Sequence, residues 1–397
     1  MHRRTFLKTS VAAASVLLAP SLDAETGTPG EYRVAGDVRF PEKRPLIVHS
    51  DRPPLLETPR EVFARPLTPN DAFFVRWHTP KFPLAIDLED YRINVHGLVD
   101  KRLYLTIDDL KTKFEPVEIT ATLQCGGNSR SAFRPTTSGI QWGNGAVGCA
   151  RWKGARLRDV LAEAGPTPEA RYLHFNGRDK AVIDKAPRLI RELKLDEIND
   201  EIIIAYEMNG EPLPLLNGYP VRLVIPGWYS DSWVKMLSDI TVTAKHTPLY
   251  YMDVAYRVPD NECECETPDA PAPKTKPITE MNVKSLIGKP RSGTQVRTGT
   301  PVEIEGVAFD GGHGIEAVHI STDGGKTWEE ASLGQAKSPY AFRSFRFSFV
   351  PEQKGKLILM SRAVNTAGEM QPMPEAVRWN HGGYKYNGVD RIAIDVV

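Results

Sequence analysis

Cysteine is scarce in this chain, and the few cysteines do not form a common motif. Four occur among 397 residues, namely Cys125, Cys149, Cys263 and Cys265. The absence of paired Cys-x-x-Cys motifs excludes the usual structural zinc sites, and the absence of Cys-x-x-Cys-His excludes a covalently attached c-type haem. We therefore expect no haem in this chain. One residue separates Cys263 from Cys265, which would strain a disulfide between them, so a plain loop, a redox role and a metal role all stay open.

The chain also lacks net charge and, beyond its N-terminus, a long apolar run. Lys plus Arg number 50 and Asp plus Glu number 50, so nothing indicates a nucleic-acid partner. No segment of the mature chain is long enough to span a bilayer. Hydrophobic residues make up 41% and charged residues 25%, which is typical of a globular protein. The length favours two or three domains.

The N-terminus has the pattern of an export signal. Arg3 and Arg4 precede an apolar run over residues 11–20, and Leu22-Asp23-Ala24 is suited to cleavage. This predicts a twin-arginine signal peptide over residues 1–24. A basic start to a membrane anchor is the alternative, but the apolar run has about half the length needed. Because the twin-arginine route exports folded proteins, we expect a periplasmic enzyme that acquires its cofactor before export.

The rest of the chain predicts an arm followed by an α+β domain. Residues 25–70 are rich in proline and charge, and we expect an extended arm that wraps the first domain. Residues 71–265 mix short helices with buried strands. We expect a helix to start after the cap residue Thr106 and an amphipathic helix over residues 155–164 to stop at Gly165. Apolar runs over 202–205 and 221–225 predict buried strands.

A change of composition marks the second domain. Residues 266–279 contain repeated prolines and predict a stiff, solvated linker. Beyond it, residues 280–397 contain alternating apolar segments separated by turns such as Asp323-Gly324-Gly325. This pattern predicts an immunoglobulin-like β-sandwich.

Two segments of the first domain carry residues suited to chemistry. In Phe73–His78, strand alternation places Phe74, Arg76 and His78 on one face, opposite Phe73, Val75 and Trp77. Cys125 lies in Leu123-Gln124-Cys125-Gly126-Gly127-Asn128-Ser129-Arg130. A thiolate with two planar guanidinium groups would suit a soft metal and a small oxyanion. The alternatives are a buried thiol followed by a turn, and salt-bridged surface residues on the strand.

With these segments and three further blocks, the chain resembles the sulfite oxidase family of molybdopterin enzymes. The further blocks are residues 150–157, 205–210 and 218–222, the last leading to Val234-Lys235. The resemblance covers nearly everything after residue 70. It is greatest to the bacterial periplasmic sulfite dehydrogenases, through residues 226–230 and the lack of a fused haem domain. It implies a molybdopterin-binding catalytic domain and a C-terminal dimerisation domain.

The resemblance assigns the metal ligand and the substrate pocket. It implies that Cys125 is the protein thiolate on molybdenum and that Arg76, Arg130 and Tyr256 surround sulfite. Trp142 matches the pocket tryptophan of the family. For Tyr256 and Trp142, ordinary packing is the alternative.

The resemblance also assigns the residues that hold the pterin. Arg222, Lys235 and His78, with the backbone near Ser232 and Trp233, match the phosphate site, where several charge-assisted donors are needed. The full set of residues expected at the cofactor is Phe74, Val75, Arg76, Trp77, His78, Asp179, Asn217, Arg222, Ser232, Trp233 and Lys235. Asp179 matches a residue that binds the pterin ring.

Two positions depart from the animal enzymes of the family. Asn217 replaces a histidine, and we expect the asparagine to keep the pterin contact. Residues 379–383 lack an arginine that the comparable segment supplies to the pocket. The lost arginine affects the expected anion affinity and substrate.

The resemblance implies a sulfite dehydrogenase that passes electrons to a separate c-type cytochrome. A homodimer is expected, and a heterodimer with a cytochrome subunit is the alternative. Other activities on the same scaffold are sulfane dehydrogenase and methionine sulfoxide reductase. A non-enzymatic exported binding module would leave the leader and the Cys125 segment unexplained.

Overall fold

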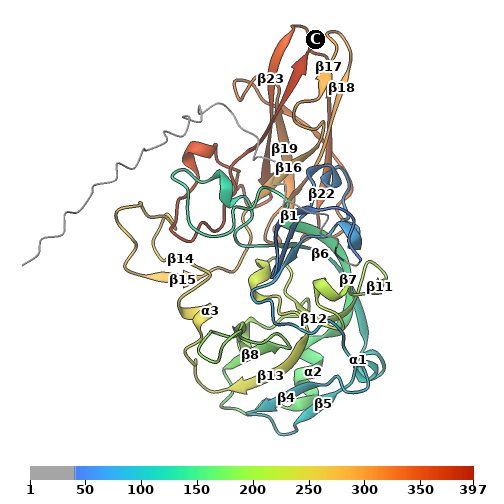
Figure 1. Cartoon of the computed structure of the whole chain (residues 1–397), viewed down its shortest axis with the longest axis vertical. Coiled ribbons are helices and arrows are strands. Elements are labelled where there is room, and N and C mark those ends of the chain that lie inside the picture. Colours follow the sequence, from blue (N-terminus) through green and yellow to red (C-terminus); the bar gives the residue numbers. More distant parts are fainter. Residues whose placement is uncertain (1–39, 41) are drawn as a thin grey trace, which may run out of the picture. The chain divides into compact units, whose positions relative to one another are not determined.

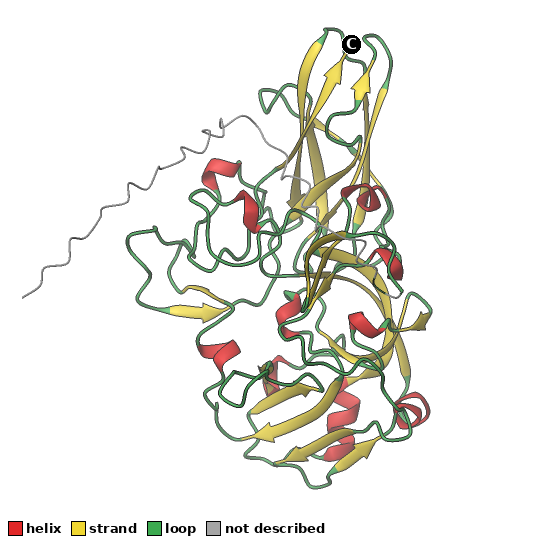
Figure 2. Cartoon of the chain, in the orientation of Figure 1, coloured by secondary structure: helices red, strands yellow, loops and turns green. Residues whose placement is uncertain are grey.

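The computed structural model describes residue 40 and residues 42–397. The predicted signal peptide and the first part of the predicted arm lie outside these residues. Strands dominate the described chain, and its helices are short (Figure 2). This agrees with an α+β domain followed by a sandwich.

The described part of the predicted arm contains short strands and 3₁₀ helices, which the sequence did not indicate. Strand β1 (Ile47–Asp51) pairs with β2 (Pro54–Glu57), and β2 pairs with β3 (Val75–Arg76). A 3₁₀ helix, η1 (Arg60–Ala64), follows them. Its Phe63 packs into a cluster with sandwich residues such as Leu286, and Arg60 forms an ion pair with Asp390. The arm therefore packs against both domains.

Two five-stranded sheets form the framework of the first domain (Figure 1). One has the order β5-β4-β13-β8-β9, in which β4 and β13 are parallel and the other pairs antiparallel. Its strands are β4 (Ile93–Gly97), β5 (Leu103–Leu105), β8 (Tyr172–Gly177), β9 (Ile190–Lys194) and β13 (Leu237–Thr243). The other sheet has the order β11-β10-β7-β6, with β12 also paired to β10. Its strands are β6 (Pro116–Gln124), β7 (Val147–Arg156), β10 (Ile203–Met208), β11 (Glu211–Pro212) and β12 (Arg222–Val224).

The predicted start of the first helix and the predicted end of the second are confirmed, whereas residues 155–156, expected in the second helix, belong to strand β7. Helix α1 (Ile107–Thr112) begins after Thr106, whose hydroxyl accepts the Asp109 amide while the Asp109 carboxylate accepts the Thr106 amide. Helix α2 (Leu157–Ala164) ends at Gly165, which has a φ of 66°. Glycine adopts this left-handed conformation without a Cβ clash.

The C-terminal domain is a sandwich of two sheets. One has the order β16-β18-β22-β21 and the other β17-β24-β23-β19-β20. Their strands are β16 (Lys284–Lys289), β17 (Gln295–Val296), β18 (Val302–Phe309), β19 (Ile315–Ser321), β20 (Glu329–Glu330), β21 (Ser332–Leu333), β22 (Arg343–Phe349), β23 (Gly355–Asn365) and β24 (Asp390–Val396). Inward residues such as Ile304, Val318 and Leu359 are completely buried between them. The predicted sandwich is confirmed.

The segment between the domains is more ordered than a solvated linker. Its last residues form β15 (Thr275–Pro277), which pairs with β14 (Arg257–Pro259). Cys263 and Cys265 are joined by a disulfide in the loop between these strands. Within residue 40 and residues 42–397, no helix has the length and apolar character needed to cross a bilayer.

Lys284 lies buried where the sandwich meets the first domain. Its Nζ donates to Ser129 Oγ at 2.6 Å and to the Tyr386 carbonyl at 3.1 Å. Burial lowers the pKa of Lys284 from 10.5 to about 7, although Asp390 opposes the shift. Between these two pH values the unfolded chain binds a proton that the folded chain lacks. Lys284 therefore makes the free energy of unfolding increase as the pH rises through this range.

We expect Lys284→Met to remove that contribution. From pH 7 to 9, the free energy of unfolding should rise less steeply in the variant, by up to about 1.4 kcal/mol per pH unit. Urea unfolding at pH 7, 8 and 9 measures both slopes. Lys289→Met, at an exposed lysine of the same strand, is the control. Equal slopes in Lys284→Met and the original protein would contradict the expectation.

Candidate active site

A cavity with about 530 Å³ of empty space, partly open to solvent, gathers residues from distant parts of the chain. Nine of the residues predicted from the sequence line it: Phe74, Arg76, His78, Cys125, Asn217, Arg222, Trp233, Lys235 and Tyr256. The remaining lining residues were not predicted and are Leu123, Leu189, Leu216, Ser230 and Asp231. The cavity is thus the place where the predicted site assembles.

The predicted alternation around β3 is confirmed. Phe74, Arg76 and His78 line the cavity, whereas Val75 and Trp77 pack in a hydrophobic cluster behind it. Trp77 Nε1 donates to the Leu216 carbonyl at 3.0 Å. The side chains of Val75 and Trp77 therefore do not reach the cavity, although the Trp77 ring lies 3.9 Å from Lys235 Nζ.

Cys125 follows the end of β6 and is 7% exposed. The loop after it turns back sharply, and Ser129 has a φ of 65°. The Arg130 guanidinium lies against Gly127, where a Cβ atom would approach Arg130 Nη1 to 2.5 Å. Glycine at 127 thus lets the loop close over Arg130. The other free thiol, Cys149, lies outside the cavity, and burial raises its pKa to about 12.

Two buried cations at one side of the cavity fit an anionic group. Arg222 is 4% exposed and donates to the carbonyls of Asn217 and Trp233 at 2.8 and 3.0 Å. Arg222 Nε and Trp233 Nε1 have no hydrogen-bond partner among the described residues. Burial lowers the pKa of Arg222 to about 9 and that of Lys235 well below its usual value. Unused donors beside costly buried charges match the requirements of a phosphate.

Arg76 is a third cation in the cavity lining. No hydrogen bond or ion pair involves its guanidinium within the part of the chain that the structure describes. Its carbonyl accepts from Lys235, which fixes the backbone. Because a guanidinium offers several donors in a plane, Arg76 can bind an oxyanion through two oxygens.

Tyr256 lines the cavity together with Arg76. It lies between α3 (Tyr250–Asp253) and β14, and its hydroxyl is hydrogen-bonded to His78 Nε2. Burial raises the pKa of Tyr256, and burial followed by the Arg76 charge lowers the pKa of His78. One hydrogen bond therefore joins a neutral phenol to a neutral imidazole at the cavity wall.

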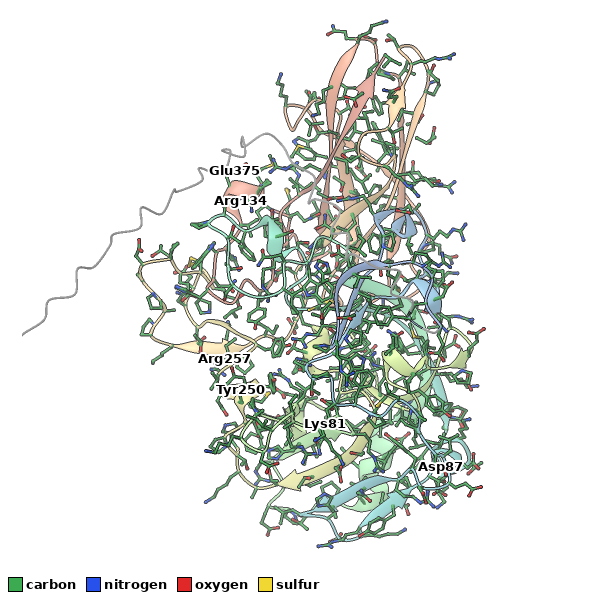
Figure 3. The ribbon with its side chains drawn as sticks, in the orientation of Figure 1. Lys81, Asp87, Arg134, Tyr250, Arg257 and Glu375 are labelled. Atoms are coloured by element: carbon green, nitrogen blue, oxygen red, sulfur yellow. A yellow bond between two sulfur atoms is a disulfide. The ribbon has the colours of Figure 1, made fainter. Side chains whose placement is uncertain are left out.

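Contacts within the segment from α3 to β14 stabilise its conformation. Arg257 donates to the Met252 carbonyl, and Figure 3 shows Arg257 close to Tyr250. The Tyr251 ring lies 5.2 Å from the His78 ring and 5.9 Å from the Tyr256 ring. This packing fixes the position of Tyr256, whose φ of 57° is unusual for a bulky residue.

A buried ion pair was missed by the sequence analysis. Arg191 Nη2 lies 2.8 Å from Asp231 Oδ2, and both side chains are at most 2% exposed. Arg191 also lies 5.6 Å from the Tyr256 ring centroid and donates to the Tyr251 carbonyl. Burial raises the pKa of Asp231 to about 6, against the effect of Arg191. Charged residues 40 positions apart are usually on the surface, so no sequence signal indicated this pair.

Besides Val75 and Trp77, four more predicted residues lie outside the cavity lining, namely Arg130, Trp142, Ser232 and Asp179. Arg130 donates to the Ile140 carbonyl and, through two nitrogens, to the Gly382 carbonyl. It therefore fastens the C-terminal segment instead of presenting a second free guanidinium. Trp142 packs edge-on against His49 at 4.7 Å. Ser232 Oγ accepts from Arg191, and Asp179 is buried at the end of β8 with its pKa raised by burial.

The side-chain amide of Asn217, which stands where the animal enzymes have a histidine, is held by two hydrogen bonds. Its Nδ2 donates to the Phe74 carbonyl at 3.0 Å, and its Oδ1 accepts from Lys43 Nζ at 2.6 Å. Lys43 also donates to the Asn70 and Phe73 carbonyls. The arm thus supports the cavity wall, which the sequence did not indicate.

Comparison with known proteins assigns this arrangement to a family. Residues 78–251 match the oxidoreductase molybdopterin binding domain, and residues 275–397 match the Mo-co oxidoreductase dimerisation domain. Mitochondrial sulfite oxidase of Rattus norvegicus is 35% identical over 374 residues, covering 90% of this chain and 67% of the rat protein. The chain belongs to the sulfite oxidase family.

Further relatives extend the family assignment. Sulfite oxidase of Arabidopsis thaliana is 30% identical over 382 residues, covering 89% of this chain and 94% of the plant protein. Among solved structures, the sulfane dehydrogenase SoxCD from Paracoccus pantotrophus superposes with a TM-score of 0.74 at 26% identity. That superposition covers 96% of this chain and 94% of the SoxCD chain. The chain spans about two thirds of the length of the mammalian relatives.

The residues of the cavity fit the cofactor of the sulfite oxidase family. No three His, Cys, Asp or Glu side chains converge on a metal position within residue 40 and residues 42–397. The buried cations Arg222 and Lys235 and the unused Trp233 donor suit the phosphate of a pterin. Cys125 is the soft ligand available in the same cavity.

Proposed function

We propose that this protein is a periplasmic sulfite dehydrogenase that oxidises sulfite to sulfate and passes electrons to a c-type cytochrome. The observation that carries the proposal is the unpaired guanidinium of Arg76 in the same cavity as Cys125 and Tyr256. The predicted signal peptide of residues 1–24 supports export. The absence of a Cys-x-x-Cys-His motif from this sequence supports an external electron acceptor.

Arg76 would orient the sulfite anion, while Tyr256 and His78 would hold a proton at the cavity wall. The overall change is sulfite plus water to sulfate, two protons and two electrons. A molybdenum–pterin group bound at Cys125 would accept both electrons and release them singly to the cytochrome. Arg76 would compensate the charge of substrate and product, and Tyr256 would orient the bound oxyanion through its phenol.

The C-terminal sandwich would mediate a homodimer, as the name of its matching domain suggests. Tight pairing with a cytochrome subunit is the alternative. Sedimentation of the purified protein with and without the cytochrome would distinguish these two assemblies.

A sulfane dehydrogenase is the second candidate, because SoxCD superposes over nearly the whole chain. We favour sulfite as the substrate because the relatives named sulfite oxidase are more similar in sequence to this chain than SoxCD is. The decisive experiment measures molybdenum content together with reduction of cytochrome c by sulfite and by protein-bound sulfane sulfur. If the protein contains molybdenum but oxidises only sulfane sulfur, the substrate is sulfane sulfur and not sulfite. If the correctly exported protein contains no molybdenum, the proposal of a molybdenum enzyme is refuted.

Arg76→Gln tests the anion site. We expect the KM for sulfite to rise about 10- to 100-fold, because a bidentate charge-assisted contact is lost. Steady-state kinetics of the molybdenum-loaded enzyme gives this value. Lys81→Gln removes one positive charge at an exposed position labelled in Figure 3 and is the control. An unchanged KM in Arg76→Gln would overturn the role of Arg76.

A further inference from the structure

The cavity contains a carboxylate where an anion is expected to bind. Asp231 lines the same space as Arg76, Cys125 and Tyr256. A buried negative charge opposes a divalent oxyanion, because charges interact over long distances where water is excluded. The carboxylate therefore requires an explanation that packing alone does not supply.

Asp231 is buried, and its carboxylate forms an ion pair with Arg191. It lies in the 3₁₀ helix η6 (Ser230–Ser232), whereas its partner Arg191 lies in β9. Asp231 Oδ2 is 2.8 Å from Arg191, and Oδ1 lies 3.8 Å from the place that a Cβ atom at Gly126 would occupy. Gly126 is the residue after Cys125. One oxygen thus holds Arg191, while the other faces the Cys125 loop.

Arg191 is held just as firmly. Its Nη2 donates to Ser232 Oγ at 3.2 Å, its Nη1 donates to the Tyr251 carbonyl, and its guanidinium lies over the Tyr256 ring. Neither residue of the pair can swing into solvent, since both are almost completely buried. Without Asp231, Arg191 would be a second cation next to the Tyr256 wall.

We propose that Asp231 determines the anion affinity of the cavity by neutralising Arg191, so that Arg76 alone binds the oxyanion and sulfate can leave. The inference rests on the proposed sulfite oxidation. Substrate and product are both small sulfur oxyanions, and the product sulfate is divalent at neutral pH. A site with two unopposed guanidinium groups would retain the product. A fixed carboxylate weakens the binding of both substrate and product. Weaker product binding benefits turnover when product release is slow.

Asp231→Asn tests the proposal in the molybdenum-loaded protein. Asparagine keeps the shape of the side chain and an oxygen for Arg191, but it removes the charge. We expect sulfate to bind about tenfold more tightly, both as a competitive inhibitor and in calorimetry without turnover. The KM for sulfite should fall with it, while kcat stays equal or decreases. Asp87→Asn, at an exposed position labelled in Figure 3, is the control.

The double variant Arg191→Met/Asp231→Leu separates charge from structure. It removes one positive and one negative charge together, so sulfate affinity should return to within about threefold of the original protein. A purely structural role predicts weaker sulfate binding in both variants. Asp231→Ser provides the same charge change if the asparagine variant does not accumulate.

The outcomes distinguish this inference from the proposed function. Tighter sulfate binding by Asp231→Asn, without any sulfite turnover in the original protein, would support the charge assignment and refute the sulfite activity. Sulfite turnover with unchanged or weaker sulfate binding by Asp231→Asn would refute the role of Asp231 and leave the activity intact.

Discussion

Replacing Cys125 with serine is expected to lower sulfite turnover by about 1000-fold or more, since removing an essential reacting group has effects of this order. Cys125 lines the cavity and is the soft ligand there, whereas a serine hydroxyl is a hard, protonated group at neutral pH. The measurement is turnover normalised to molybdenum content, with circular dichroism to verify the fold. Turnover within tenfold of the original protein would exclude Cys125 as the metal ligand.

Cys149→Ala is the matched control for this variant. Cys149 is also a buried free thiol, but it lies in β7 against Phe342 and outside the cavity. We expect normal turnover per molybdenum and a lower melting temperature, because a small buried group is lost. Loss of turnover in both cysteine variants would indicate a general packing effect and not a ligand at 125.

Arg222→Met is expected to weaken cofactor retention about 30- to 1000-fold, because a buried charge-assisted contact to an anion is lost. Burial already lowers the pKa of Arg222 to about 9, and no carboxylate pairs with it in the described part of the chain. An anion bound there would offset this cost, so the loaded protein should be more stable than the cofactor-free protein. The variant should reduce that difference.

Two measurements test the Arg222 expectation. Released pterin is quantified per chain by fluorescence, and melting temperatures are compared for loaded and cofactor-free protein. Arg346→Met, at an exposed arginine of the sandwich that is 74% accessible, is the control. An unchanged pterin content and an unchanged gap between the two melting temperatures would place the cofactor anion elsewhere.

Local patterns were sufficient for many elements of the fold. The Thr106 cap, the Gly165 stop and the strand that became β18 depend on interactions between residues close in sequence. The alternation of Phe74, Arg76 and His78 also follows from strand geometry alone. For this reason these features could be predicted without the structure.

Other residues have contacts that depend on partners distant in the sequence. Arg130 follows Cys125 closely, yet its guanidinium is occupied by the carbonyls of Ile140 and Gly382. The position of Gly382, more than 250 residues away, is invisible in the local sequence. The same holds for Lys43, which reaches Asn217 across 174 positions.

Residue patterns alone predicted the two-domain organisation, the strand alternation that turns Arg76 into the cavity, and the likeness to the sulfite oxidase family that pointed to Cys125. Which cations are available to an anion became clear from the folded arrangement. Arg76 is unpaired within the described residues, Arg130 is bound to carbonyls, and Arg191 is neutralised by Asp231. Charge in a cavity depends on which partners the fold brings within a few ångströms, and that information is absent from residue identity and spacing.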